Sequence, residues 1–160
     1  MEQKIPVILY TDIGEDIDDS WALIMMLKQP QLKPLMILTD TGDTAYRGAI
    51  CAKLLQIAGR QEIEIGLGLP QSSKGFHNSL QSWLAGFQVE DYDGGVHRDG
   101  VGRMIELIMD SPEPVTVISI TPAVSMAEAL RREPRIAGKV RLVGMYGSIW
   151  KRHEGEDGAI

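Results

Sequence analysis

Short apolar runs alternate with longer amphipathic stretches along the chain. Five runs have the length and composition of buried strands, at residues 5–10, 35–38, 63–67, 115–120 and 140–145. Four helices are predicted between them, at residues 21–27, 44–59, 101–109 and 122–132, the last with a proline in its first turn. This order predicts an α/β fold with a mostly parallel, Rossmann-like sheet that carries helices on both faces.

Residues 68–98 do not follow this alternation. The segment is rich in Gly, Ser, Gln and Asn, and is longer than the loops of most compact domains, so we expect it to lie over a site or to hold a short helix. The spacing of Trp83 and Phe87 suits one helical turn packed on the core, and stacking on a nucleobase is the alternative. His77 and His97 are expected to be solvated, the alternative being an approach to a substrate.

The turn after the first predicted strand concentrates acidic residues. Asp12, Glu15, Asp16, Asp18 and Asp19 occupy five of eight positions between a strand and a helix. Helix capping accounts for one or two of them. Five close negative charges repel one another, and a bound cation or raised pKa values commonly offset that repulsion. From the residues alone, a site for a hard cation such as calcium and simple capping both stay open.

Two more segments are expected at the same edge of the sheet, where the carboxyl ends of parallel strands meet. Asp40 and Asp43 follow the second strand, and a turn or an N-cap is the expected role of Asp40. The backbone carbonyls of residues 121–125 are expected to face the crevice that holds Asp12. Tyr46 and Arg47, at the start of the second helix, are expected to be solvated, the alternative being that they reach the crevice.

Composition narrows the function classes. The 160 residues predict one domain, and 22 Asp plus Glu against 16 Lys plus Arg argue against a nucleic-acid surface. Cys51 is the only cysteine, which excludes an intramolecular disulfide, and its helical position predicts a buried structural thiol. The first apolar run is too short for a signal sequence or a membrane span. We therefore expect a cytoplasmic protein with no membrane partner.

Several segments resemble the inosine-uridine-preferring nucleoside hydrolases. Residues 11–23, Thr-Asp-Ile-Gly-Glu-Asp-Ile-Asp-Asp-Ser-Trp-Ala-Leu, are similar to the aspartate signature of that family, in its longer variant with two extra residues before the Asp pair. Residues 41–44 and 54–60 resemble its second element, 111–117 and 120–130 its third, and 143–148 the strand and glycine turn that follow. The resemblance covers nearly the whole chain.

The resemblance implies hydrolysis of the N-glycosidic bond of a ribonucleoside or related ribosyl compound, with Ca²⁺ as cofactor and water as nucleophile. Asp12 would be the catalytic residue, as a calcium ligand and general base. Asp19 would bind calcium through its carboxylate and Val124 through its backbone carbonyl. Asp18 would hold a ribose hydroxyl, and Asp43 would contact the substrate near the sugar site.

The chain also departs from the family pattern. Asp43 stands where the family usually has Asn, and Tyr10 replaces a common acidic position. Family members continue with a Glu and Asn pair that grips ribose, and with a His-Asp pair that supplies the leaving-group acid and a further calcium ligand. We therefore expect residues 1–160 to form a single α/β domain that is an incomplete nucleoside hydrolase-like domain, with homo-oligomers formed through exposed apolar surface. The alternative is a non-catalytic sugar- or cation-binding protein on the same scaffold, inactive as an isolated chain.

Overall fold

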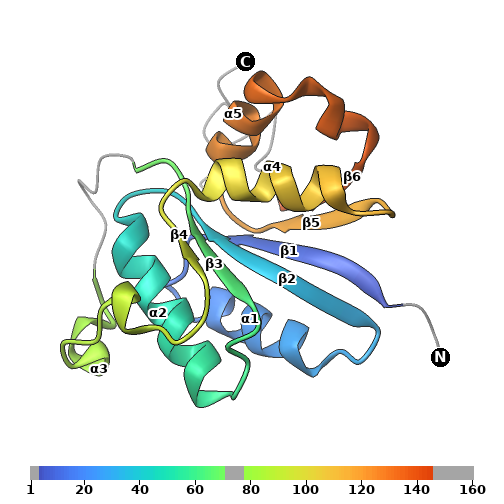
Figure 1. The fold of residues 1–160 in the computed structure, drawn as a ribbon. Helices are drawn as coiled ribbons and strands as arrows, with labels where there is room; N and C mark the ends of the chain where they lie inside the picture. Colours follow the sequence, from blue (N-terminus) through green and yellow to red (C-terminus); the bar gives the residue numbers. More distant parts are fainter. Residues whose placement is uncertain (1–3, 71–77, 146–160) are drawn as a thin grey trace, which may run out of the picture.

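The computed structural model describes residues 4–70 and 78–145, which form one six-stranded sheet with helices on both faces (Figure 1). The strands are β1 (Ile5–Thr11), β2 (Leu32–Thr39), β3 (Glu64–Leu67), β4 (Val96–His97), β5 (Val115–Ser119) and β6 (Val140–Gly144). They lie in the order β4-β3-β2-β1-β5-β6, and every neighbouring pair is parallel. The predicted α/β class and parallel sheet are confirmed.

The helices divide between the two faces of this sheet. They are α1 (Asp18–Lys28), α2 (Thr44–Ile57), α3 (Gln81–Leu84), α4 (Gly100–Asp110) and α5 (Val124–Arg132), with short 3₁₀ turns η1 (Val89–Asp91) and η2 (Pro134–Gly138). Figure 1 shows α1 and α2 on one face, and α4 and α5 on the other. No helix in the described parts of the chain is long and apolar enough to cross a membrane.

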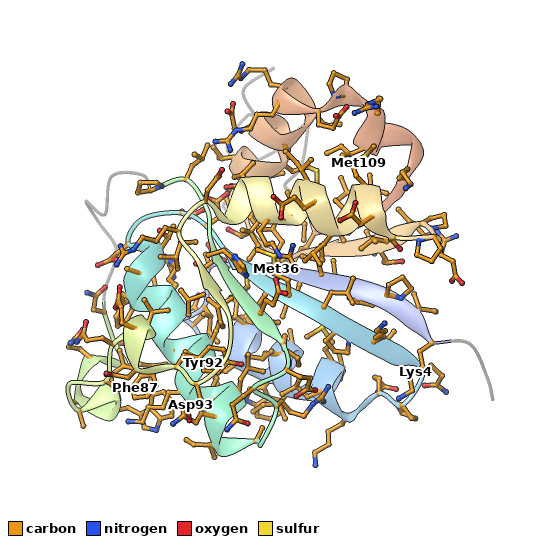
Figure 2. All side chains as sticks on the ribbon, viewed as in Figure 1. Lys4, Met36, Phe87, Tyr92, Asp93 and Met109 are labelled. Carbon is orange, nitrogen blue, oxygen red and sulfur yellow. The ribbon has the colours of Figure 1, made fainter. Side chains whose placement is uncertain are left out.

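The central strand β1 is buried on both faces, as its continuous apolar run predicts. Val7 and Leu9 belong to the core cluster beneath α1 and α2, whereas Ile8 and Tyr10 belong to the cluster beneath α4 and α5. Met36 of β2, labelled in Figure 2, is fully buried in that second cluster. The helices on the two faces of the sheet therefore pack against the same central strands.

The chain order sets the position of the crevice. From β1 the chain moves outward through β2, β3 and β4, and β5 then returns to the opposite side of β1. In such sheets, ligands bind beyond the carboxyl ends of the strands, at the point where the strand order reverses. Here that point lies where β1 leads to Asp12 and β5 leads to Thr121.

The observed elements differ from the sequence prediction mainly in the last helix and the fourth strand, and α1 and β2 also begin three residues earlier than predicted. The last helix, α5, begins at Val124 with Ala123 as its N-cap, so Pro122 precedes the helix. The strand β4 escapes prediction because its two residues form no apolar run. The expected short helix within residues 68–98 is present as α3.

Candidate functional site

An acidic cavity of about 460 Å³ opens at the carboxyl edge of β1 and β5. All five acidic residues of the turn after β1 line it. The other lining residues follow β5 and β6, and the full set is Asp12, Glu15, Asp16, Asp18, Asp19, Ile120, Thr121, Pro122 and Met145. Segments more than 100 positions apart in sequence thus meet in one hollow, which we call the acidic cavity.

Asp12 lies at the end of β1 and is partly buried in the wall of this cavity. Burial raises the pKa of its carboxyl group above the ordinary value. The positive charge of Arg47 and a hydrogen bond from the side chain of Thr121 act in the opposite direction. The net result is a carboxylate that holds a proton more readily than a solvated Asp.

Asp19 lies in the first turn of α1 and is only 9% exposed. Burial raises its pKa to about 6, and repulsion from Asp12 and Asp18 acts in the same direction. The hydroxyl of Thr11 donates a hydrogen bond to Asp19 Oδ1 and partly offsets the rise. Asp18, by contrast, is exposed at the edge of the cavity.

The donors in the acidic cavity fit a hard cation in their chemistry. Carboxylate and carbonyl oxygens are the ligands that calcium takes, usually six to eight of them. The partly buried Asp12 and the buried Asp19, both with raised pKa values, would also gain from a nearby positive charge. Within residues 4–70 and 78–145, however, no three His, Cys, Asp or Glu side chains lie close enough together to hold a metal ion by themselves.

Val124 is next to the acidic cavity without lining it. It is the first residue of α5, and its backbone N–H donates to the carbonyl of Pro122, with N and O 2.9 Å apart. Pro122 and Thr121 form the cavity wall itself. The ligand role of the Val124 carbonyl stays a prediction.

Asp43 lies outside the acidic cavity. It is the N-cap of α2, and its Oδ1 accepts a hydrogen bond from the backbone N–H of Tyr46 at 3.0 Å. It lines a separate hollow of about 250 Å³ that also contains Phe87 and Val89. Asp43 therefore does not line the cavity that holds Asp12 and Asp19, and its contact with the sugar stays a prediction.

Asp40 is fully buried and caps a helix far along the chain. Its Oδ1 accepts from the backbone N–H of Thr41 and its Oδ2 from that of Ser125, both at 2.8 Å. Since Ala123 at the N-cap of α5 offers no side-chain acceptor, Asp40 takes that role from β2. Asp40 therefore combines the expected local turn contact with a cap on a helix other than the one that follows it.

The prediction that Arg47 is solvated is wrong. Arg47 is 3% exposed, because its side chain lies against the loops after β1 and β2. Its guanidinium donates to the backbone carbonyls of Asp12, Ile13 and Thr41. The sequence signal that could have shown this is the need for a positive charge near five clustered acids.

The same prediction is wrong for Tyr46, which is 8% exposed. Its hydroxyl donates to the carbonyl of Gly14 at 3.3 Å and accepts from the backbone N–H of Leu80 at 2.9 Å. Tyr46 thus connects the acidic turn to the segment before α3.

Trp83, Phe87 and His97 do not line the acidic cavity. Phe87, labelled in Figure 2, packs against the core as predicted, whereas Trp83 is 37% exposed and lines an apolar cavity with Trp21. His97 is on β4, with Nε2 3.0 Å from a carboxylate oxygen of Glu64. His77 lies outside the described residues.

Comparison with known proteins gives related sequences that are about twice as long. A probable uridine nucleosidase 1 of Oryza sativa subsp. japonica is 25% identical over 153 residues, which cover 90% of this chain and 47% of that protein. Uridine nucleosidase 1 of Arabidopsis thaliana is 26% identical over 156 residues, which cover 90% of this chain and 45% of that protein. The chain spans about half the length of the curated relatives it matches.

Solved structures share the fold. An inosine-uridine preferring nucleoside hydrolase from Bacillus anthracis superimposes with a TM-score of 0.72 at 18% identity, over 93% of this chain and 52% of that one. The type III effector protein XopQ, solved with adenosine diphosphate ribose, gives a TM-score of 0.74 at 20% identity, over 97% of this chain and 48% of that one. The family model of the inosine-uridine preferring nucleoside hydrolases matches residues 7–156. The chain belongs to the inosine-uridine preferring nucleoside hydrolase family.

Proposed function

We propose that this chain supplies the aspartate-bearing part of a site that hydrolyses the N-glycosidic bond of a ribonucleoside or a related ribosyl compound. The observation that carries the proposal is the acidic cavity at the carboxyl edge of β1 and β5, where Asp12 and Asp19 have raised pKa values. Membership of the family supports the same reaction class.

We propose Ca²⁺ as the cofactor of this site. Asp12 and Asp19 would hold the ion through their carboxylates, and Val124 through its carbonyl beside the cavity. When bound, the ion would supply the positive charge that orients a hydroxyl-bearing sugar and lowers the pKa of water. A hard cation agrees with the all-oxygen donor set of the cavity.

Asp12 is the proposed general base. A base that works near neutral pH benefits from a pKa above that of a solvated carboxyl, and burial moves the pKa of Asp12 in that direction. The hydrogen bond from Thr121 fixes one side of its carboxylate, and the other side would take the proton from water. Cleavage through an oxocarbenium-like sugar would then be favoured by the surrounding negative charge.

Asp18 is the proposed partner of a ribose hydroxyl, because it is exposed at the edge of the acidic cavity and ionised carboxylates accept hydrogen bonds from hydroxyls. The family resemblance implies a substrate contact for Asp43 as well. Its position at the N-cap of α2, outside the cavity lining, supports the capping role better.

We also propose that the protein acts in the cytoplasm and associates with copies of itself. Its one cysteine is buried, so the described core uses no disulfide. Trp21, Met25, Val143 and Met145 are each more than half exposed, which gives an apolar surface that self-association would cover. Analytical ultracentrifugation over a range of protein concentrations tests this association.

A second candidate function is a non-catalytic sugar- or cation-binding protein. It requires only the oxygen donors of the acidic cavity, with the exposed Asp18 at its edge, and no general acid or base. Release of ribose from inosine and uridine separates the two, measured with this chain and with any longer polypeptide that contains it. Calcium-dependent release that D12N abolishes supports hydrolysis, whereas calcium or ribose binding without release by the longer polypeptide supports the alternative. We predict little or no turnover by the 160 residues alone.

A further inference from the structure

A buried cation lies beside the acidic cavity, in a position that neither the family resemblance nor the proposed reaction assigns. Arg47 is in the second turn of α2, one turn after the N-cap Asp43, and is 3% exposed. A guanidinium is costly to bury unless its donors and its charge are matched. The hydrogen-bond partners of Arg47 therefore indicate which part of the structure its burial stabilises.

The guanidinium of Arg47 connects two loops that come from different strands. From the loop after β1, the carbonyls of Asp12 and Ile13 accept from Nη1, with the Ile13 oxygen at 2.9 Å. From the loop after β2, the carbonyl of Thr41 accepts from Nε at 2.7 Å. The planar fork of an arginine can serve acceptors on two sides at once, which the single ammonium of a lysine cannot do in the same geometry.

The second of these loops needs support. Thr41 has a φ of 67°, in the left-handed region that disfavours a β-branched residue. Its hydroxyl lies 3.2 Å from that of Thr121, which lines the acidic cavity. The bond from Arg47 to the Thr41 carbonyl therefore holds a strained turn that reaches the cavity wall.

The charge of Arg47 acts on the same residues that its hydrogen bonds position. It opposes the rise in pKa that burial imposes on Asp12 and on Asp19. Carboxyl groups that repel one another would otherwise favour a loop conformation that moves them apart. Arg47 thus combines a fixed positive charge with three contacts to the backbone of the loops.

We propose that Arg47 is the positioning residue of the acidic cavity, holding the loops that carry Asp12 and Thr41 in their binding arrangement before any cation is bound. The expected effect of Arg47 on calcium binding rests on the proposed function. Its structural part, an ordered loop in the metal-free protein, is independent of that function.

The decisive variant is R47K, which keeps the charge and removes the fork. In chelated protein we expect backbone amides in residues 12–16 to exchange with solvent about tenfold faster in R47K than in the parent chain. We also expect the calcium dissociation constant of R47K, measured by calorimetry, to rise at least about tenfold. Loss of a residue that orients metal ligands without binding the metal itself has an effect of that size. R103K is the matched control, because Arg103 makes its charged hydrogen bonds to Glu64 and Glu106. R103K should change neither quantity.

Unchanged exchange in residues 12–16 of R47K overturns the proposal. If R47K does not fold, the parent chain decides the matter: slow exchange of residues 12–16 without calcium supports positioning by Arg47, and slow exchange only after calcium is added contradicts it. A parent chain that shows slow exchange but binds no calcium supports the role of Arg47 while contradicting the calcium part of the proposed function.

Discussion

The hydroxyl of Tyr10 donates a hydrogen bond to the carboxylate of Asp40, and both side chains are fully buried. The backbone N–H of Ser125 lies 2.8 Å from the Tyr10 hydroxyl oxygen and 2.8 Å from Asp40 Oδ2. The same hydroxyl lies 3.2 Å from the carbonyl of Pro122, in the wall of the acidic cavity. Two residues at the ends of neighbouring strands thus fix the first turn of α5. This contact gives a structural role to Tyr10.

The Y10F variant tests this contact. Removal of the hydroxyl leaves the buried Asp40 carboxylate with one donor fewer, which we expect to lower the free energy of unfolding by about 1–3 kcal/mol. Urea denaturation measures the change. The control is Y92F, because the Tyr92 hydroxyl donates to the neutral carbonyl of Ile63 at 2.8 Å. If the free energy of unfolding falls no further in Y10F than in Y92F, the hydrogen bond from Tyr10 does not stabilise the Asp40 carboxylate as proposed.

The D43A variant tests the assignment of Asp43 as a helix cap. Loss of the bond to the Tyr46 N–H should lower the free energy of unfolding by about 1 kcal/mol. D43N should retain most of the stability, since Asn caps as well as Asp, and it also restores the usual residue of the family. Thermal unfolding compares the three proteins. Equal stability of D43A and D43N would argue against the capping role.

The raised pKa of Asp19 predicts how the free energy of unfolding of the metal-free protein depends on pH. Its pKa is raised to about 6 in the folded state from the ordinary value of 3.8, so the folded state holds the proton more tightly than the unfolded state. The contribution of Asp19 to stability is therefore present below about pH 4 and is lost as the pH rises through about 6. Between these values the stability of the parent chain relative to D19N should fall by roughly 1–3 kcal/mol.

Denaturation of both proteins with chelator present, at several pH values, measures this difference. Comparison with D19N is necessary because other carboxyl groups act in the opposite direction. The pKa of Glu64, for example, is lowered by its hydrogen bond to Arg103. A stability difference between the parent chain and D19N that does not vary with pH would contradict the raised pKa.

Local patterns account for most of the fold prediction. The apolar runs and helical spacings predict five of the six strands and the four longer helices, because each is an uninterrupted segment with its own periodicity. The two-residue β4 has no such pattern and depends on its pairing with β3. The start of α5 after Pro122 likewise depends on a tertiary contact, the cap from Asp40.

The candidate site is predictable where its chemistry is local and unpredictable where it depends on packing. Five acids in one turn after a strand indicate a possible cation site at the carboxyl edge of β1, with helix capping as the alternative. The burial of Arg47 does not follow from its place at a helix start, since its three acceptors lie in two separate loops. Asp40 and Ser125 are 85 positions apart, and no periodicity connects them.

Calcium titration by calorimetry decides whether the acidic cavity is a metal site, at about pH 7, where a group of pKa about 6 is mostly ionised. We predict one calcium site in the parent chain, and an affinity at least about tenfold weaker in both D12N and D19N. D93N, at an exposed position outside the cavity lining, should bind like the parent chain. Two results would contradict the assignment of the acidic cavity as the metal site. One is no calcium binding by the parent chain, and the other is calcium binding by D12N and D19N that is as tight as that of the parent chain.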